Sequence, residues 1–483
     1  MSITPNFRRN AFFAAFVMFA SFAPAAAQGV TARLEIESFS PAVLKVFGRF
    51  PQPARSFSFE TESAGVKGLE DRISSIELRD ESGGVIGYRK AGSGSVFAAE
   101  PVVTFSYSVA IDPPSDSLQG AHASWLSGKT ALLFVSDLLP ALSAGPQSAS
   151  VTFGTPEGWS VTAPVALSGT GSFEVSDIRD AVFLLSGSAR ETTLNEWGAS
   201  VRLMVDGDWQ FEDSDVKEHT KELLKYYRSV FGSIPSKLIR VILLRSPDDK
   251  LIDRWSAETK GNTVVIVSSP SRYRNKGLQR LNEQLRHELL HLWMPNAAGL
   301  SGDYAWFYEG FAVYEALKTG AVLEQIRFED LLSTLTEANR RSTLGGMGAG
   351  KKSLIDLGKE RFEGAGVRFY SRAMLIAFLC DVEMLNASRG KRGSETLLRE
   401  LFEAGRKDPR NDGTSEALRV MGRHPELRTI VNRYIEGAEV PDWSHAIGLA
   451  GLAEDPVRGG GRLIVGPRPR KAILKRLGYN TDR

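Results

Sequence analysis

The sequence predicts a multidomain protein with an N-terminal all-β sandwich, an α+β domain after it and an α-helical domain toward the C-terminus. Three observations predict this class. Apolar and polar residues alternate in the first third, helix and strand patterns then mix, and helical periodicity dominates from about residue 321. We expect a leader over 1–27, the sandwich over 28–172, the α+β domain over 173–320, the helical domain over 321–455 and a basic tail over 456–483.

The leader is typical of secretory signal peptides. Arg8 and Arg9 precede an apolar run over 11–23, and Ala25 to Ala27 form a small-residue cleavage site. We therefore expect export, to a bacterial periplasm or by full secretion, and no later stretch is apolar for long enough to span a bilayer. Because Cys380 is the sole cysteine, no intrachain disulfide can form and packing must stabilise the fold.

The sandwich prediction rests on a period of two. Leu34 and Ile36 alternate with charged residues, and the alternation returns over 105–111 and 151–153. Clusters of Gly, Pro, Ser and Asp separate these runs and predict turns. Two packed antiparallel sheets are the expected result.

The middle of the chain mixes helix and strand signals. We expect a helix from Ser214 to Gly232, strands over 239–244 and 262–268, and then a helix that contains residue 287. Helical periodicity continues over 369–385 and 394–404. These segments predict the α+β domain and the helical domain.

The charge balance gives no reason to expect a highly charged partner. The chain has 59 basic and 57 acidic residues, and removal of the two leader arginines makes the balance even. We therefore expect no nucleic-acid partner. We expect the basic tail to be solvated or docked on the surface rather than to bind an anion. The glycine-rich run over 345–351 is expected to be a loop, because Lys352 stands where a phosphate-binding loop has Ser or Thr.

One short motif carries most of the chemistry. His287-Glu288-Leu-Leu-His291 places two imidazoles four residues apart, on one face of a helix, where both can bind one ion. Glu288 follows the first histidine and is placed to act on a metal-bound water rather than on the metal. Glu309 lies in the first turn of a second helix, over 306–318, and would complete a three-ligand zinc site with one open position. We expect Asp303 or Ser301 to cap this helix and Gly320 to follow its end.

The alternative is a surface helix that carries two solvated histidines. Leucines recur at helical spacing on the side opposite the histidines, and the helix becomes apolar nearly all round after Leu289. A helix of this kind is buried, and buried histidines need partners. Glu309 also lies among aromatic residues. These observations favour the metal site.

Four segments of the chain, taken in order, carry a family resemblance. They are His287-Glu-Leu-Leu-His291-Leu-Trp293, Trp306-Phe-Tyr-Glu309-Gly-Phe-Ala, Phe369-Tyr370-Ser-Arg372-Ala373 and the closing stretch from Asn432 to Leu452. Together they resemble the gluzincin metallopeptidases and, within them, the glycyl aminopeptidase family. The resemblance implies a thermolysin-like catalytic domain over 173–320, one Zn²⁺ ion and a peptide substrate. It also implies that Tyr370 stabilises the oxyanion formed on the scissile carbonyl.

The chain departs from that family at two places. Too little of the sequence follows residue 455 for the family's PDZ domain. Gluzincin aminopeptidases bind the substrate's free amine with a Glu on the strand before the zinc helix, whereas residues 261–269 contain none and Glu258 comes earlier. An edge strand there can still bind an extended peptide. The sequence is compatible with aminopeptidase activity and with endopeptidase activity.

The function that these patterns predict is an exported zinc metallopeptidase. His287, His291 and Glu309 bind the metal, and Glu288 and Tyr370 are the catalytic residues. The alternative is an exported zinc- or peptide-binding protein that keeps the fold without catalysis. The sequence indicates no oligomeric state.

Overall fold

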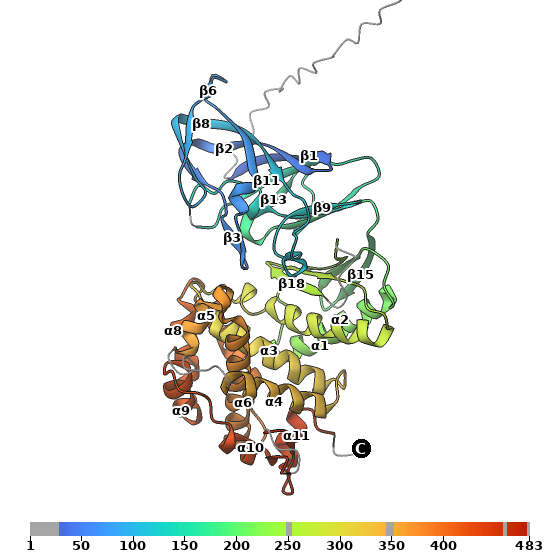
Figure 1. The fold of residues 1–483 in the computed structure, drawn as a ribbon, viewed down its shortest axis with the longest axis vertical. Helices are drawn as coiled ribbons and strands as arrows, with labels where there is room; N and C mark the ends of the chain where they lie inside the picture. Colours follow the sequence, from blue (N-terminus) through green and yellow to red (C-terminus); the bar gives the residue numbers. More distant parts are fainter. Residues whose placement is uncertain (1–28, 144, 248–253, 344–351, 457–460, 481–483) are drawn as a thin grey trace, which may run out of the picture.

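The computed structural model describes residues 29–143, 145–247, 254–343, 352–456 and 461–480. The predicted leader and the glycine-rich run over 345–351 lie outside these residues. Figure 1 shows an elongated molecule with sheets at one end and helices at the other. The prediction of several sheets followed by a helical C-terminal region is confirmed.

Two sheets form the N-terminal end. The larger has, in order across the sheet, β13 (Phe173–Val175), β11 (Ala149–Gly154), β1 (Val30–Phe39), β2 (Ala42–Ser58), β8 (Ser95–Ala110), β5 (Ile73–Arg79) and β6 (Val85–Ile86), with β7 (Tyr88–Lys90) paired to β8. The smaller has β12 (Ser160–Thr162), β14 (Val182–Ser186), β10 (Thr130–Phe134) and β9 (Trp125–Ser127). Side chains from both sheets, including Leu44, Tyr107 and Phe183, share one apolar core. β14 lies beyond residue 172, where the sandwich was expected to end.

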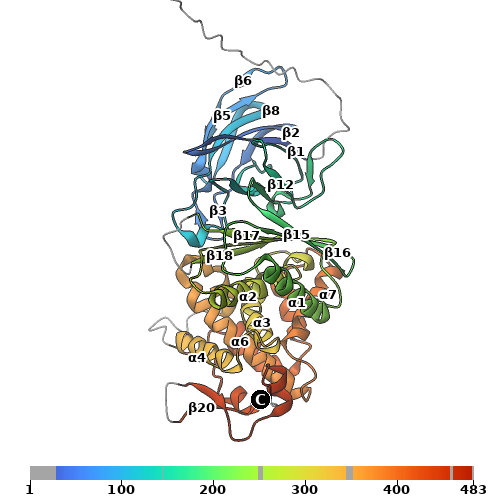
Figure 2. The ribbon, with the colours of Figure 1, turned by 90° about the vertical axis from the view of Figure 1, so that its right-hand side faces the viewer.

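A third sheet lies between these strands and the helices (Figure 2). Its order is β15 (Arg190–Glu196), β16 (Ala199–Val205), β17 (Leu238–Arg245), β19 (Thr263–Ser268) and β18 (Trp255–Lys260). β16, β17 and β19 are parallel, whereas β18 pairs antiparallel with β19 at the edge. A separate small hairpin is formed by β3 (Glu62–Ser63) and β4 (Val66–Lys67).

Both faces of the third sheet are buried. Val241 and Leu243 of β17 pack with the helices, and Ile242 and Leu244 pack with strands of the smaller N-terminal sheet. Successive side chains of a strand point to opposite faces, so a strand buried on both faces is apolar at consecutive positions. This explains the uninterrupted apolar run over 241–244.

The rest of the chain is mainly helical. The helices are α1 (Asp213–Phe231), α2 (Arg274–His291), α3 (Ala305–Val322), α4 (Phe328–Thr343), α5 (Leu354–Lys359), α6 (Gly366–Ala387), α7 (Ser394–Lys407), α8 (Gly413–Met421), α9 (Arg428–Ile430), α10 (Ser444–Ala450) and α11 (Lys471–Arg476). α2 packs on α3, and α3 packs on α6. None of the helices in the described ranges is long and apolar enough to cross a membrane.

The described part of the basic tail packs on the helices. β20 (Leu452–Glu454) pairs with β21 (Leu463–Val465), and α11 contacts α6. Ile473 and Leu474 are buried, so the tail contributes apolar side chains to the core, while Lys471 and Lys475 of α11 are exposed.

The end of α3 differs from the prediction. Gly320 does not follow the helix but lies inside it, because α3 continues to Val322. A Cβ at Gly320 would lie 2.9 Å from Cζ of Arg286, so this glycine marks a close contact with a side chain of α2 rather than the end of the helix. At the start of the helix, the Asp303 carboxylate accepts the amide of Ala305 at 3.0 Å, whereas the Ser301 hydroxyl donates to the carbonyls of Arg410 and Asn411.

Candidate metal centre

Two helices bring the three predicted metal ligands together. His287 and His291 lie one turn apart at the end of α2, and Glu309 lies near the start of α3. The two Nε2 atoms are 3.0 Å apart, and Oε2 of Glu309 lies 3.5 Å from that of His287 and 3.8 Å from that of His291. Among the described residues this is the one group of three or more potential ligands whose donor atoms converge.

The donor set fits a tetrahedral zinc ion. Ligands at the usual zinc distance of about 2.0–2.1 Å are roughly 3.3 Å apart in a tetrahedral site, close to the separations seen here. Nδ1 of His291 lies 2.9 Å from the carbonyl oxygen of Met294. This contact places the ring proton on Nδ1 and leaves the Nε2 lone pair directed at the other donors.

The charges of the three ligands support one another. Burial raises the pKa of Glu309, but His291 and His287 lower it to about 2, so this carboxylate is ionised at neutral pH. Burial lowers the pKa of His287, yet Glu309 and Glu288 raise it above its usual value. The two imidazoles therefore stabilise the negative charge of Glu309, and this carboxylate stabilises positive charge at the point where the three donor atoms converge.

Glu288 is buried beside this cluster without belonging to it. Oε2 of Glu288 accepts a hydrogen bond from the Thr259 hydroxyl at 2.7 Å. Burial raises the pKa of Glu288, while His287 and His291 act in the opposite direction. A carboxylate with a raised pKa is suited to accept a proton and to release it again.

Tyr370 lies in α6, within electrostatic range of the same residues. Burial raises the pKa of its phenol well above the usual value, and the charges of Glu309 and Glu288 raise it further, while Arg361 lowers it. The phenol therefore stays protonated and can donate a hydrogen bond. The structure thus places all five predicted site residues in one region, at the junction of α2, α3 and α6.

Two residues that the sequence analysis did not assign to the site lie beside it, both on the edge strand β18. One is Thr259, the partner of Glu288. The other is Glu258, whose charge raises the pKa values of Glu288 and Tyr308. The local signal that could have identified β18 is the two-residue turn of Gly261 and Asn262, which joins it to β19.

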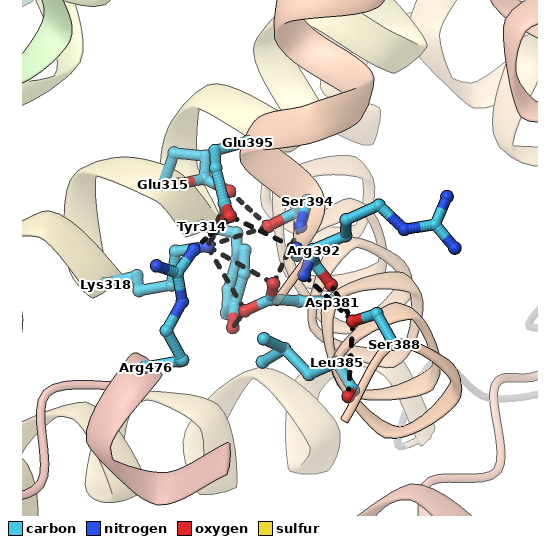
Figure 3. A network of polar contacts seen from close by, with 11 residues as sticks. Tyr314, Glu315, Lys318, Asp381, Leu385, Ser388, Arg392, Ser394, Glu395 and Arg476 are labelled. Atoms are coloured by element: carbon cyan, nitrogen blue, oxygen red, sulfur yellow. Dashed lines mark hydrogen bonds and ion pairs between the residues drawn. The ribbon is translucent and has the colours of Figure 1, made fainter. Parts of the chain in front are cut away.

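A buried ionic network lies farther along α3 and α6 (Figure 3). Nζ of Lys318 lies 3.1 Å from Glu315, 3.2 Å from Asp381 and 2.9 Å from Glu395. The Tyr314 hydroxyl donates to Asp381 at 2.6 Å, and Arg476 of α11 pairs with Glu395. The network joins the helix of Glu309 to the helix of Tyr370 and to the C-terminal tail.

Known structures share this arrangement of elements. No protein-family model matches the sequence, and no curated protein matches it. An aminopeptidase N family protein from Idiomarina loihiensis matches with a TM-score of 0.74 at 14% identity, over 91% of this chain and 82% of that one. An M1 zinc metallopeptidase from Deinococcus radiodurans, a mutant bound to a Tyr-Ser-Ala substrate, matches with a TM-score of 0.54 at 14% identity, over 86% and 95% of the two chains.

Sequence identity this low establishes the fold and not the activity. The fold agrees with the gluzincin resemblance that the four sequence segments predicted, and that prediction is confirmed. The chain therefore has the fold of the M1 zinc metallopeptidases.

Proposed function

We propose that this protein is a zinc metallopeptidase that hydrolyses peptide bonds. The observation that carries the proposal is the convergence of His287, His291 and Glu309 beside a second carboxylate, that of Glu288, which is buried and which the metal does not need as a ligand. A purely structural zinc site has four protein ligands, whereas a catalytic site has three and an open position. The neighbour that binds a Tyr-Ser-Ala substrate has the same fold, which makes a peptide the best-supported substrate class.

The residues around the site have separate roles in this reaction. Zn²⁺, when bound by His287, His291 and Glu309, supplies a Lewis acid that activates water and polarises the scissile carbonyl. Glu288 accepts the proton of the attacking water and delivers it to the leaving amine, while Thr259 orients the carboxylate. Tyr370 donates a hydrogen bond to the oxyanion.

The proposal extends to substrates with a free N-terminus. Glu258 lies on the edge strand β18, and burial of its carboxylate next to the site provides a negative charge for an ammonium group. An extended peptide can pair with such an edge strand through its main chain. Peptides with a free amine are then expected to be better substrates than their N-acetylated forms.

We also propose that the protein is exported. The basis for this proposal is the leader sequence over 1–27.

The alternative function is a zinc- or peptide-binding protein without catalysis. Glu288 argues against it, because burying a carboxylate costs free energy and metal binding alone does not require that group. The two functions differ in one measurable property, the turnover of peptides by the zinc-loaded protein.

The test is the substitution Glu288→Gln, which removes the proton acceptor and keeps the shape. We expect kcat on a mixed peptide library to fall by roughly 10²–10⁴-fold with zinc content unchanged. Glu218→Gln, the same change at an exposed position of α1, is the control and should keep full activity. An active Glu288→Gln protein would refute the role of the base, and a wild-type protein that binds zinc and cleaves no peptide would favour the alternative.

A further inference from the structure

The N-terminal strands send a loop onto the edge strand of the site. The loop lies between a short 3₁₀ turn, Ser117–Gln119, and β9, and it contacts β18 (Figure 1). The amide of Ala121 donates to the Ser256 hydroxyl at 2.9 Å. Two residues farther along β18, Oε2 of Glu258 lies 2.8 Å from Nδ1 of His122. The two contacting residues are 136 positions apart in the chain.

Hydrogen bonds of neighbouring residues anchor the loop that carries His122. The indole of Trp125 donates to the carbonyl of Gly120 at 2.7 Å. Ser124 donates its amide and its hydroxyl to Asp137, at 2.8 Å and 2.6 Å. Arg72 pairs with the same carboxylate at 2.8 Å. Since Trp125, Ser124 and Asp137 are buried, the loop is part of the packed structure and its histidine has a defined position.

The contact leaves part of the Glu258 carboxylate available to a ligand. Oε2 contacts His122, whereas Oε1 lies 3.8 Å from Nζ of Lys260. Ser256 and Glu258 are two apart on the strand and share a face, the one that the loop covers. Thr259 points to the other side, toward Glu288. β18 therefore contacts the predicted base and presents a second carboxylate whose orientation depends on the N-terminal loop.

The electrostatics agree with this geometry. Burial raises the pKa of Glu258, but Lys260 and the hydrogen bond with His122 bring it below the usual value. Glu258 is therefore ionised at neutral pH although it is largely buried. An ionised carboxylate beside the site attracts a cationic group of the ligand and repels an anionic one.

We propose that His122 is a positioning residue of the peptide site, which orients the Glu258 carboxylate toward the free α-ammonium group of a bound peptide. The N-terminal strands then form part of the binding site rather than a separate support. The proposal rests on the proposed function only in that the ligand is a peptide; it does not require turnover.

Binding without catalysis tests the proposal separately from the enzyme activity. The experiment uses the zinc-loaded Glu288→Gln variant. Calorimetry measures its Kd for Tyr-Ser-Ala and for the N-acetylated form of this tripeptide. His122→Ala should weaken binding of the free tripeptide roughly tenfold, the effect of one charge-assisted hydrogen bond, and change binding of the acetylated form less than twofold. His122→Asn, which keeps a donor near the position of Nδ1, should restore most of the affinity. His445→Ala, a change at an exposed histidine of α10, is the control.

Two further variants keep the test decisive. Glu258→Gln keeps the shape and removes the charge, and it should show the same selective loss. Adding His122→Ala to Glu258→Gln should then weaken binding no further, because His122 acts through that carboxylate. In the protein with Glu288 restored, His122→Ala should raise KM and leave kcat within about twofold. Equal loss for both peptides, or no loss, would overturn the proposal, whereas a wild-type protein that binds peptide without cleaving it would reject only the enzymatic function.

Discussion

At the scale of single residues, the site depends on how each ionisable group is oriented. His291 is fixed by the carbonyl of Met294, Glu288 by the hydroxyl of Thr259, and Glu309 by the two imidazoles. The two site carboxylates consequently differ in pKa: that of Glu309 is lowered to about 2 and that of Glu288 is raised. Similar groups in different surroundings can thus act as ligand and as base.

The proposed role of Tyr370 predicts a change in kcat without a change in zinc binding. Tyr370→Phe removes the phenol hydroxyl and keeps the ring, so the hydrogen bond that we propose for the oxyanion is lost. We expect kcat to fall roughly 10²-fold, with little change in zinc content by elemental analysis. Tyr88→Phe, at an exposed position of β7, should have no effect. An unchanged kcat for Tyr370→Phe would exclude this residue from the reaction.

At the scale of elements, the geometry of the site depends on the approach of α3 to α6. Glu309 and Tyr370 lie on these two helices, and Gly310 is next to Glu309 in the sequence. A Cβ at Gly310 would lie 2.7 Å from Cβ of Ala373. Real Cβ contacts are longer, so a side chain at Gly310 must separate the helices.

Gly310→Ala is therefore expected to affect stability and activity together. Overpacking of this kind costs about 1–3 kcal/mol, and displacement of α6 should also lower kcat. Gly448→Ala is the matched control, because a Cβ at this helical position of α10 meets nothing within 4 Å. Alanine there should raise the free energy of unfolding by roughly 0.5–1 kcal/mol. A Gly310→Ala protein as stable and as active as the wild type would contradict the close helix contact.

At the scale of the whole molecule, the buried network joins segments distant in the sequence. Three carboxylates, Glu315, Asp381 and Glu395, lie around two cations, Lys318 and Arg476 (Figure 3). The carboxylates outnumber the cations by one. Burial is the main effect that raises the pKa of Glu315 to about 7. Lys318 is nearly inaccessible to solvent, so the network stabilises the packing of α3, α6, α7 and α11 only while its charges are compensated.

The raised pKa of Glu315 predicts a pH dependence of stability with a defined sign. Between about pH 4.5, the value in the unfolded chain, and about pH 7 the folded protein binds more protons than the unfolded one. The wild type should therefore lose stability relative to Glu315→Gln as pH rises from about 5 to about 8, by on the order of 1–3 kcal/mol. Unfolding midpoints of the two proteins at fixed zinc concentration measure this difference, and Glu329→Gln at an exposed position of α4 is the control. A constant difference across this range would show that Glu315 does not titrate there.

Local patterns were sufficient for much of the fold. The strands over 239–244 and 262–268 and the helix closed by Gly232 are present within a residue or two, because their signals are local: apolar runs, a glycine at a helix end and a turn. Gly320 shows where local reasoning fails. This residue resembles a helix stop in the sequence, but it lies inside α3, against the Arg286 side chain of another helix.

The sequence by itself was sufficient to predict the groups of the candidate centre, since the four-residue spacing of His287 and His291 follows from helix geometry and requires no other segment. The tertiary structure decided how that centre is completed. Pairing of β18 with β19 brings Thr259 and Glu258 to the end of α2, and a loop more than a hundred residues earlier brings His122 to Glu258. Such contacts depend on strand pairing and domain packing between distant segments, which no local pattern of residues specifies.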